Sequence, residues 1–332
     1  MNKILLNYFI FSFLIFFIIA KISYRLNLVD LPNKRKIHSK PTSFMGGLAL
    51  SLIYLLALQL FNFHYSSFNT ILFISFFIAL IGFIDDKYYL NIIAKLGLLT
   101  APVLYIIFFE KIIVHQLGNY NGFVVELGKF ALPFTLFSSL LLINAFNYFD
   151  GMDGVLGLTT ISVLAILYFL SSDESIRLFL IIIFIPILIF LIFNFSILKL
   201  PKLFLGDSGS LLLGYIISFI LIFIENQSDV HPILLAWSVS IFVYEFLSIN
   251  ISRIINKKGL FLAGKDHLHH LLFYKVQSIF LVNIIMFFMN IFLFLAGYYT
   301  FKLVNPITSL ILFILLFLLF YLIRKNFLVK KN

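Results

Sequence analysis

Cysteine is absent from the 332 residues, and charged side chains make up only 11% of the chain. The lack of cysteine excludes disulfides and thiolate metal sites. Soluble domains average about 25% charged residues, whereas 62% of the residues here are apolar. A soluble fold of this size has no interior large enough for that much apolar surface. Lipid is therefore the expected solvent for most of the chain.

Apolar runs near the length of about 20 residues that a spanning helix needs recur along the whole chain. They predict an all-α integral membrane protein with about 11 transmembrane helices. No internal repeat or domain boundary divides the sequence, so residues 1–332 are expected to form a single polytopic membrane domain. The predicted spans are 4–22, 47–64, 70–84, 92–109, 130–147, 155–170, 177–195, 209–224, 232–252, 278–299 and 305–323.

The basic residues predict the orientation of these spans. If the N-terminus is outside and the C-terminus is cytoplasmic, 19 of the 24 Lys and Arg residues fall on inside segments. Such a bias is the positive-inside rule, and it predicts a multi-pass protein of the cytoplasmic (inner) membrane. It also explains the net charge of +10 without a nucleic-acid partner, and it favours contact with membrane lipid and phosphorylated ligands.

Asp85 and Asp86 follow the third predicted span, at the inside face. Polar residues at membrane depth are costly and tend to be functional. Two adjacent carboxylates raise each other's pKa unless a cation neutralises them. Mg²⁺ or Mn²⁺ suits such oxygen ligands. The alternative is an exposed pair that caps a helix.

Two amides and two carboxylates recur every third residue after the fifth span: Asn144, Asn147, Asp150 and Asp153. On a helix, residues at this spacing share a face, which predicts a polar ridge able to hold ribose, phosphate or metal. Gly151 and Gly154 permit close approach of a ligand. A polar loop with turn glycines is the alternative.

The segment Phe204-Leu-Gly-Asp207-Ser-Gly-Ser opens the eighth span. Asp207 is expected either to cap this helix or to hold a metal beside a phosphate bound at the helix N-terminus. Phe204 offers a flat ring on which a base can stack.

Three histidines lie close together in the last large inside loop, at His267, His269 and His270. Zinc is one reading, but the nearby lysines oppose a bound cation, so we favour a sugar-diphosphate ligand. A hydrogen-bonded helix start is the structural alternative. Arg35 and His38, in a basic run after the first span, are candidate substrate contacts, although the residues alone favour positive-inside decoration or lipid head-group contact.

Together these motifs resemble the polyprenyl-phosphate N-acetylhexosamine-1-phosphate transferase family, in particular its undecaprenyl-phosphate N-acetylglucosamine-1-phosphate transferase branch. The resemblance runs from Asp30 to His270, and all the motifs fall on one predicted membrane face. It implies a UDP-N-acetylhexosamine donor, undecaprenyl phosphate as acceptor, Mg²⁺, UMP as product, and transfer of a sugar 1-phosphate that starts a lipid-linked cell-envelope glycan. A homodimer is compatible with such a helical protein.

The resemblance also implies roles for single residues. Asp207 matches the magnesium ligand, with Asp86 as a second candidate, and Phe204 matches the ring that stacks on uracil. Asp85 and Asp86 match the pair assigned to the lipid phosphate and to catalysis. The remaining matches are Asn144, Asn147, Asp150 and Asp153 near nucleotide and metal, Lys95 as the basic residue after the Asp pair, and His267, His269 and His270 in sugar recognition.

Other membrane proteins with clustered polar residues fit the sequence less well. An intramembrane aspartyl protease needs a Gly two residues before its Gly-Asp motif, and a CDP-alcohol phosphotransferase needs Ala-Arg soon after its Asp-Gly motif; this chain has neither. A di-iron hydroxylase needs more histidines on one face. A transporter of an anionic or nucleotide-linked solute is the non-enzyme alternative. It is expected to place charges at mid-membrane and often to show inverted repeats.

Overall fold

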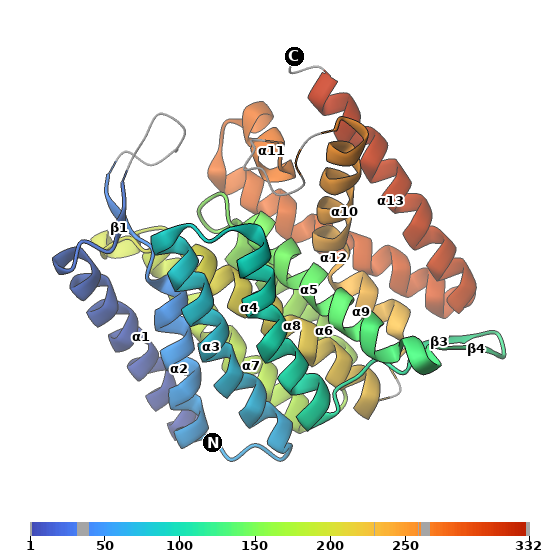
Figure 1. The fold of residues 1–332 in the computed structure, drawn as a ribbon, viewed down its shortest axis with the longest axis horizontal. Coiled ribbons are helices and arrows are strands. Elements are labelled where there is room, and N and C mark those ends of the chain that lie inside the picture. Colours follow the sequence, from blue (N-terminus) through green and yellow to red (C-terminus); the bar gives the residue numbers. More distant parts are fainter. Residues whose placement is uncertain (1, 32–39, 229, 258, 260–265, 330–332) are drawn as a thin grey trace.

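A computed structural model describes residues 2–31, 40–228, 230–257, 259 and 266–329, which form a bundle of helices with two small antiparallel β-ribbons (Figure 1). The helices are α1 (Asn2–Arg25), α2 (Gly46–Leu60), α3 (Ser66–Tyr88), α4 (Ile92–Tyr105), α5 (Ala131–Phe149), α6 (Val155–Leu170), α7 (Glu174–Asn194), α8 (Gly206–Gln227), α9 (Pro232–Ser238), α10 (Ser240–Ile255), α11 (Leu268–Val276), α12 (Ile279–Leu303) and α13 (Pro306–Val329). The strands are β1 (Val29–Asp30), β2 (Thr42–Ser43), β3 (Gln116–Tyr120) and β4 (Phe123–Glu126), and the short helical turns are η1 (Ile106–Glu110), η2 (Gly128–Phe130) and η3 (Ile197–Lys199).

Within the described residues, eight helices are long and apolar enough to cross a membrane, and nine if α9 and α10, which meet at 74°, form one bent span. The runs predicted at 47–64 and 155–170 form α2 and α6, which have only 15 and 16 residues. At 1.5 Å per residue these helices are about 22–24 Å long, shorter than a hydrocarbon core of about 30 Å. The predicted count of eleven therefore exceeds the number of full-length spans, and the short run predicted at 70–84 is a full helix of 23 residues.

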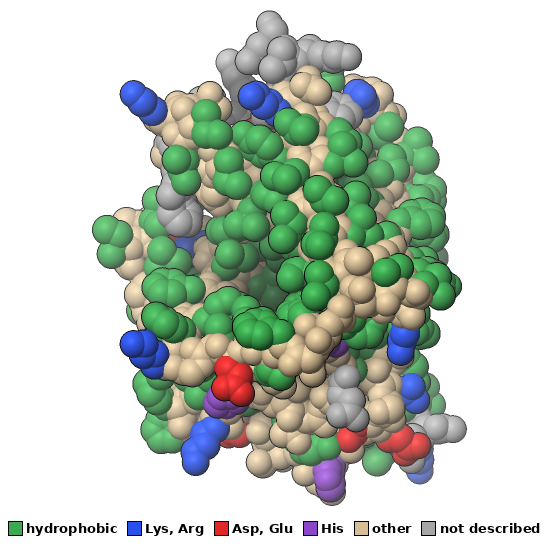
Figure 2. Space-filling model, turned by 90° about the vertical axis from the view of Figure 1, so that its right-hand side faces the viewer, with side chains coloured by type: hydrophobic (Ala, Val, Ile, Leu, Met, Phe, Trp, Pro, Cys, Tyr) green, Lys and Arg blue, Asp and Glu red, His purple; other side chains and the backbone are tan. Residues whose placement is uncertain are grey.

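The surface is that of a membrane protein. Hydrophobic side chains cover the middle of the face in Figure 2, which is hollowed at its centre, while charged side chains lie mainly toward the upper and lower margins. On the last helix an exposed apolar row faces outward: Ile311, Ile314, Leu315, Leu318, Leu319 and Leu322. Such a continuous apolar surface is stable only against lipid or another apolar partner.

Helix α8 is the centre of the bundle. In its most apolar stretch 89% of the residues are buried, and it packs against α2, α3 and α5 (Figure 1). Two glycines make this approach possible. Gly47 of α2 and Gly82 of α3 both lie directly against the α8 backbone around Ser208 and Gly209. Close backbone packing at small residues is typical of membrane helices.

Backbone hydrogen bonds between residues 43–47 and residues 204–205 fix where α8 begins. The Phe204 N–H donates to the carbonyl of Ser43 at 2.7 Å, and the carbonyl of Phe204 accepts from the Gly46 N–H at 3.0 Å. The Gly47 N–H donates to the Leu205 carbonyl at 2.9 Å. The N-terminus of α8 is thereby tied to the N-terminus of α2. We call the end of the bundle that carries the N-terminus of α8 and the C-terminal ends of α3 and α5 the site end.

These glycine contacts generate a stability prediction. In Gly82→Ala the new Cβ overlaps the backbone of Asp207 and Ser208, so we expect α3 and α8 to separate and the free energy of unfolding to fall by about 1–3 kcal/mol. Gly97→Ala is the matched control, because a Cβ there meets nothing within 4 Å and alanine favours the helix. Unfolding in detergent measures both variants. Equal effects of the two changes would contradict the close α3–α8 contact.

Candidate functional site

The backbone N–H groups at the N-terminus of α8 donate hydrogen bonds to a side chain of another helix. Asp86, in the last turn of α3, accepts from the Asp207 N–H at 3.0 Å and from the Ser208 N–H at 3.3 Å. The first N–H groups of a helix lack partners within the helix and carry partial positive charge, so a carboxylate satisfies them well. The sequence allowed Asp207 to be the cap, but α8 begins at Gly206 and no side chain of its own caps it.

Asp207 points away from its own helix end and meets two groups from α4 and α5. Its Oδ2 lies 2.5 Å from Lys95 Nζ, and its Oδ1 accepts from the Asn147 side-chain amide at 2.9 Å. Lys95 is placed by the first turn of α4, whose N-cap Asn91 accepts from the Ala94 N–H at 2.8 Å. The same Lys95 Nζ lies 2.7 Å from Asp85 Oδ2. One ammonium thus links the carboxylates of α3 and α8.

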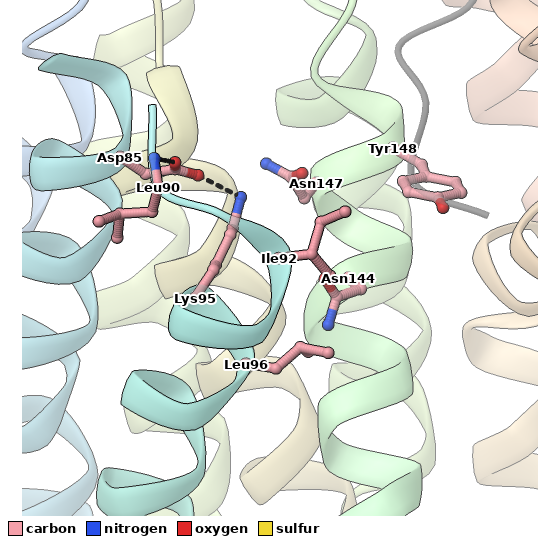
Figure 3. A pocket seen from close by; sticks show the side chains of 8 residues that line it. All are labelled: Asp85, Leu90, Ile92, Lys95, Leu96, Asn144, Asn147 and Tyr148. Carbon is pink, nitrogen blue, oxygen red and sulfur yellow. Dashed lines mark hydrogen bonds and ion pairs between the residues drawn. The ribbon is translucent and has the colours of Figure 1, made fainter. Parts of the chain in front are cut away.

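A cavity of about 180 Å³ opens beside Lys95, between α4 and α5 (Figure 3). Asp85 is fixed at its edge, since Asp85 Oδ1 accepts from the Leu90 N–H at 2.8 Å. In Figure 3 the Lys95 side chain reaches toward Asp85, with Asn147 on the facing helix. The lining consists of Asp85, Leu90, Ile92, Lys95, Leu96, Asn144, Asn147 and Tyr148. It therefore combines a charged, polar end with an apolar wall.

The predicted four-residue ridge is only half helical. Helix α5 ends at Phe149, so Asn144 and Asn147 lie on it, while Asp150 and Asp153 lie in a turn. The chain leaves the helical conformation at Asp150, with φ −83° and ψ 56°, and Gly154, with φ +78°, a conformation that suits glycine, is the N-cap residue of α6. Asn144 donates to the Leu140 carbonyl of its own helix at 2.7 Å, whereas Asn147 reaches Asp207.

Three side chains clamp the 150–154 turn. Asn194 of α7 accepts from the Gly154 N–H at 2.7 Å, and Asn283 of α12 donates to the Asp153 carbonyl at 2.8 Å. Lys202 Nζ lies 2.5 Å from Asp153 Oδ2. Sequence reasoning missed Asn194, Asn283 and Lys202 as supports of the site. Asparagines inside apolar runs were the available signal, since buried amides must find partners.

Asp150 lies at the junction between this turn and α8. Its carboxylate accepts from the Gly206 backbone N–H, yet burial, together with the charges of Asp207 and Asp153, raises the pKa of Asp150 to about 8. Asp150 therefore carries a proton at neutral pH when no cation is bound. A carboxyl group poised in this way either donates a proton or takes up a cation with release of that proton.

The histidine segment reaches the same turn from the other side. His269 is buried, with 1% of its surface exposed, and its ring packs against Gly151. The rings of His267 and His269 are stacked, with centroids 5.5 Å apart. Burial lowers the pKa of His267 to about 4, against the opposing charge of Asp266, and burial also depresses the pKa of His269. Both imidazoles are therefore neutral near pH 7.

The other sequence-predicted residues are placed as follows. The Phe204 ring lies next to the site with Lys202 Nζ 5.3 Å from its centroid. His270 contacts His269, with ring centroids 4.3 Å apart. Arg35 and His38 lie outside the described residues. The structure thus brings Asp85, Asp86, Lys95, Asn147, Asp150 and Asp207 together around the start of α8, and sets the histidines beside Gly151.

The described residues of the site offer a hard divalent cation only one or two carboxylate ligands. No group of three or more His, Asp or Glu side chains within the described residues forms a ready metal cage. Mg²⁺ often binds through one or two carboxylates and keeps several waters. Asp207 with neighbouring Asp85 or Asp86 meets that requirement, since a carboxylate offers about four lone-pair sites.

Comparison with known proteins places these residues in a family context. The model of glycosyl transferase family 4 matches residues 68–225. Undecaprenyl-phosphate alpha-N-acetylglucosaminyl 1-phosphate transferase of Escherichia coli (strain K12) is 27% identical over 276 residues, which are 81% of this chain and 75% of that protein. The probable undecaprenyl-phosphate N-acetylglucosaminyl 1-phosphate transferase of Bacillus subtilis (strain 168) is 30% identical over 269 residues, 76% of this chain and 72% of that protein.

The raised pKa of Asp150 predicts a pH-dependent stability. Because the folded state holds this proton more tightly than the unfolded state, the free energy of unfolding falls as pH rises from about 4 to about 8. In detergent with EDTA, Asp150→Asn should raise the apparent melting temperature at pH 8.5 and change it little at pH 5. Asp153→Asn is the control, since it loses the Lys202 ion pair and gains no stability. A melting temperature lowered equally at both pH values by Asp150→Asn would contradict the prediction.

Proposed function

The chain belongs to glycosyl transferase family 4, and we propose that it transfers N-acetylhexosamine 1-phosphate from a UDP-sugar to undecaprenyl phosphate, releasing UMP. The observation that carries this proposal is the meeting of Asp85, Lys95, Asn147 and Asp207 from four helices at one end of the bundle. Phosphoryl transfer needs mainly positioning and charge neutralisation, which this set provides. A transporter is less well supported, because Asp85, Lys95 and Asp207 lie in the terminal turns of α3, α4 and α8 rather than at the middle of these helices.

The cavity between α4 and α5 supports the acceptor assignment. Its polar end, formed by Lys95 and Asn147, suits a phosphate monoester, while Leu90, Ile92 and Leu96 suit the first isoprene units. An amphiphile with one phosphate and an apolar tail matches both parts at once. We assign this cavity to the phosphate end of the polyprenyl acceptor.

The donor is assigned to the opposite side of Asp207. The diphosphate would lie at the start of α8, between Asp207 and the 150–154 turn, with the uracil stacked on Phe204 and the sugar near the histidine segment. The neutral rings of His267 and His269 suit hydroxyl and amide groups, which need both donors and acceptors. This arrangement puts the phosphorus next to the sugar close to Lys95 and Asp85.

Mg²⁺ bound by Asp207 with Asp85 or Asp86 would offset charge on the diphosphate and on the leaving UMP. The side chains of the protein itself hold the reactants. Lys95 binds the acceptor phosphate and keeps its attacking oxygen near the donor, and Asn147 fixes the orientation of Asp207 by its 2.9 Å hydrogen bond. Asp86 fixes the start of α8 by accepting from the Asp207 and Ser208 N–H groups, and so sets the position of Asp207.

In the reaction, an oxygen of the lipid phosphate forms a bond to the phosphorus that carries the sugar. The bond from that phosphorus to the bridging oxygen breaks, and UMP leaves with the electron pair. Asp85 accepts any proton remaining on the lipid phosphate, although a phosphate monoester with a second pKa near 6 is largely dianionic at pH 7. Attack by an aspartate to give a phospho-enzyme is the alternative route to the same products.

The topology is part of the proposal. We propose that all eleven apolar runs cross the membrane as one domain, with α2 and α6 spanning a locally thinned region. The N-terminus would be outside and the site end cytoplasmic, in the inner membrane, where nucleotide-sugars are available. Helix α1 begins at the end away from the site and α13 ends at the site end (Figure 1), which this orientation requires. The homodimer stays a prediction.

The reaction predicts UMP release that depends on lipid. Purified protein in detergent is given undecaprenyl phosphate, Mg²⁺ and a panel of UDP-N-acetylhexosamines. One donor should yield UMP in the complete mixture only, and EDTA should abolish the signal. Asp207→Ala should lower the rate by about 100-fold or more, because it removes a charge-stabilising group. A folded protein that releases no UMP from any donor, yet accumulates a nucleotide-sugar in vesicles, would favour transport.

The two adjacent aspartates should fail in different ways. Asp85→Asn should lower UMP release by about 10²–10⁴-fold and lower the melting temperature less than Asp86→Asn does, because it loses the ion pair with Lys95 but its oxygen still accepts from the Leu90 N–H. Asp86→Asn turns an NH₂ group toward the N–H groups of α8, so it should lower the melting temperature as well as the rate. Normal turnover in Asp85→Asn would rule out both proton transfer and a phospho-enzyme at Asp85.

A further inference from the structure

A buried ion pair lies behind the histidine segment and belongs to none of the sequence motifs. Glu245 of α10 and Arg324 of α13 each expose only 1% of their side chains, and Arg324 Nε lies 3.6 Å from Glu245 Oε2. The positive-inside count treats Arg324 as a residue of an inside tail, but α13 continues past it and buries it. The carbonyl of Ser248 and the Ser252 hydroxyl accept from Arg324 Nη1, each at 3.4 Å.

Stability alone does not explain such a pair. Desolvation of two charges costs several kcal/mol per ion, and replacing a buried ion pair by apolar side chains of similar volume is often neutral or stabilising. Before Arg324, α13 is rich in Leu, Ile and Phe. The pair is therefore better explained by the groups that it positions than by the stability that it adds. Hydrogen bonds to charged groups fix the direction of the partner as well as its distance.

Glu245 and Arg324 both bond to the backbone of residues 266–268, where α11 begins. Glu245 Oε1 accepts from the Leu268 N–H at 2.6 Å. Arg324 Nη2 donates to the Asp266 carbonyl at 2.6 Å, and Arg253 Nη2 donates to Asp266 Oδ1 at 3.1 Å. His267 lies between these anchored positions, with its Nδ1 3.8 Å from Glu245 Oε1. The backbone is thus held on both sides of His267.

The anchored segment in turn determines where the next histidine lies. One residue beyond Leu268, the ring of His269 packs against Gly151, next to Asp150. A change of backbone direction at 266–268 would therefore move His269 off the 150–154 turn. The chain of contacts runs from α13 and α10, through Asp266 and Leu268, to the turn that adjoins α8.

We propose that Glu245 and Arg324 are positioning residues that hold the His267–His270 segment against the 150–154 turn, and that they thereby set the affinity for the sugar end of the nucleotide-sugar donor. This inference rests on the proposed function for the identity of the ligand. The placement of the His267–His270 segment does not depend on the proposed function. Neither residue contacts the α4–α5 cavity, so binding of the lipid acceptor should be independent of them.

The decisive variant is the double replacement Glu245→Leu, Arg324→Met. It removes both charges while keeping side chains of similar volume, so the protein is expected to fold. Tyr244→Phe is the matched control: it removes a 2.6 Å hydrogen bond from α10 to the Phe313 carbonyl of α13, one residue from Glu245, without touching the histidine segment. Glu245→Asp is the conservative single change, since its shorter side chain keeps the charge and draws back from the Leu268 N–H.

Two readouts are needed. Modification of His267 and His269 by diethyl pyrocarbonate, followed by peptide mass spectrometry, reports the placement of the segment without any substrate. We expect His269 to react about tenfold faster in the double variant and in Glu245→Asp, and to stay protected in Tyr244→Phe. Steady-state UMP release should show the donor KM raised about tenfold, a loss of binding shared by ground and transition states, with kcat and the acceptor KM within about twofold of wild type.

Several results would overturn the inference. A folded double variant with protected His269 and normal donor KM would show that the pair serves only packing. A fall in kcat at unchanged donor KM would place the pair in the chemical step, and equal rises of both KM values would indicate general loosening. If the wild-type protein itself releases no UMP, the proposed function fails, while the reactivity of His269 still decides whether the pair positions the segment.

Discussion

The carboxylate of Asp86 at the N-terminus of α8 is the contact on which the rest of the site depends. Helix α8 is the buried centre of the bundle, and the first residues of the helix include Ser208, which is fully buried; a buried N–H group without a partner costs about 1–3 kcal/mol. By accepting from the Asp207 and Ser208 N–H groups, Asp86 joins the end of α3 to the start of α8. The neighbouring residues of both helices, Asp85 and Asp207, are thereby brought to the same Lys95.

Because Asp86 of α3 caps α8, the adjacent aspartates Asp85 and Asp86 have different roles. Asp86 accepts from two N–H groups of α8, while Asp85 lies at the edge of the α4–α5 cavity and Asp207 contacts Asn147 of α5. The Gly47 and Gly82 contacts with α8 serve the same end, because only close backbone packing lets a side chain as short as Asp86 reach the next helix. The close packing of α2 and α3 against α8 therefore also determines where the carboxylates of the site lie.

The sequence predicted the helical membrane fold and the residues that meet at the site, because both depend on local patterns: apolar runs and short polar motifs at their ends. It did not predict which carboxylate caps α8, since the partner of a helix end is a tertiary contact. The predicted helical ridge over 144–153 was wrong beyond Phe149, because the chain turns between the end of α5 and Gly154, the N-cap residue of α6, whose φ is +78°. The sequence did not predict that Glu245, Arg324 and Asn283 support the site, since their partners lie up to 130 residues away in sequence.

The central claim is that nucleotide-sugar binds at the start of α8, between Asp207, the 150–154 turn and the histidine segment. Photolabelling with an azido derivative of the UDP-sugar, with peptides identified by mass spectrometry, tests it directly. The account predicts label on peptides that contain residues 144–154, 204–210 or 266–270, and loss of that label when excess UDP competes. Label confined to the opposite end of the bundle, or label at these peptides that UDP does not displace, would contradict it.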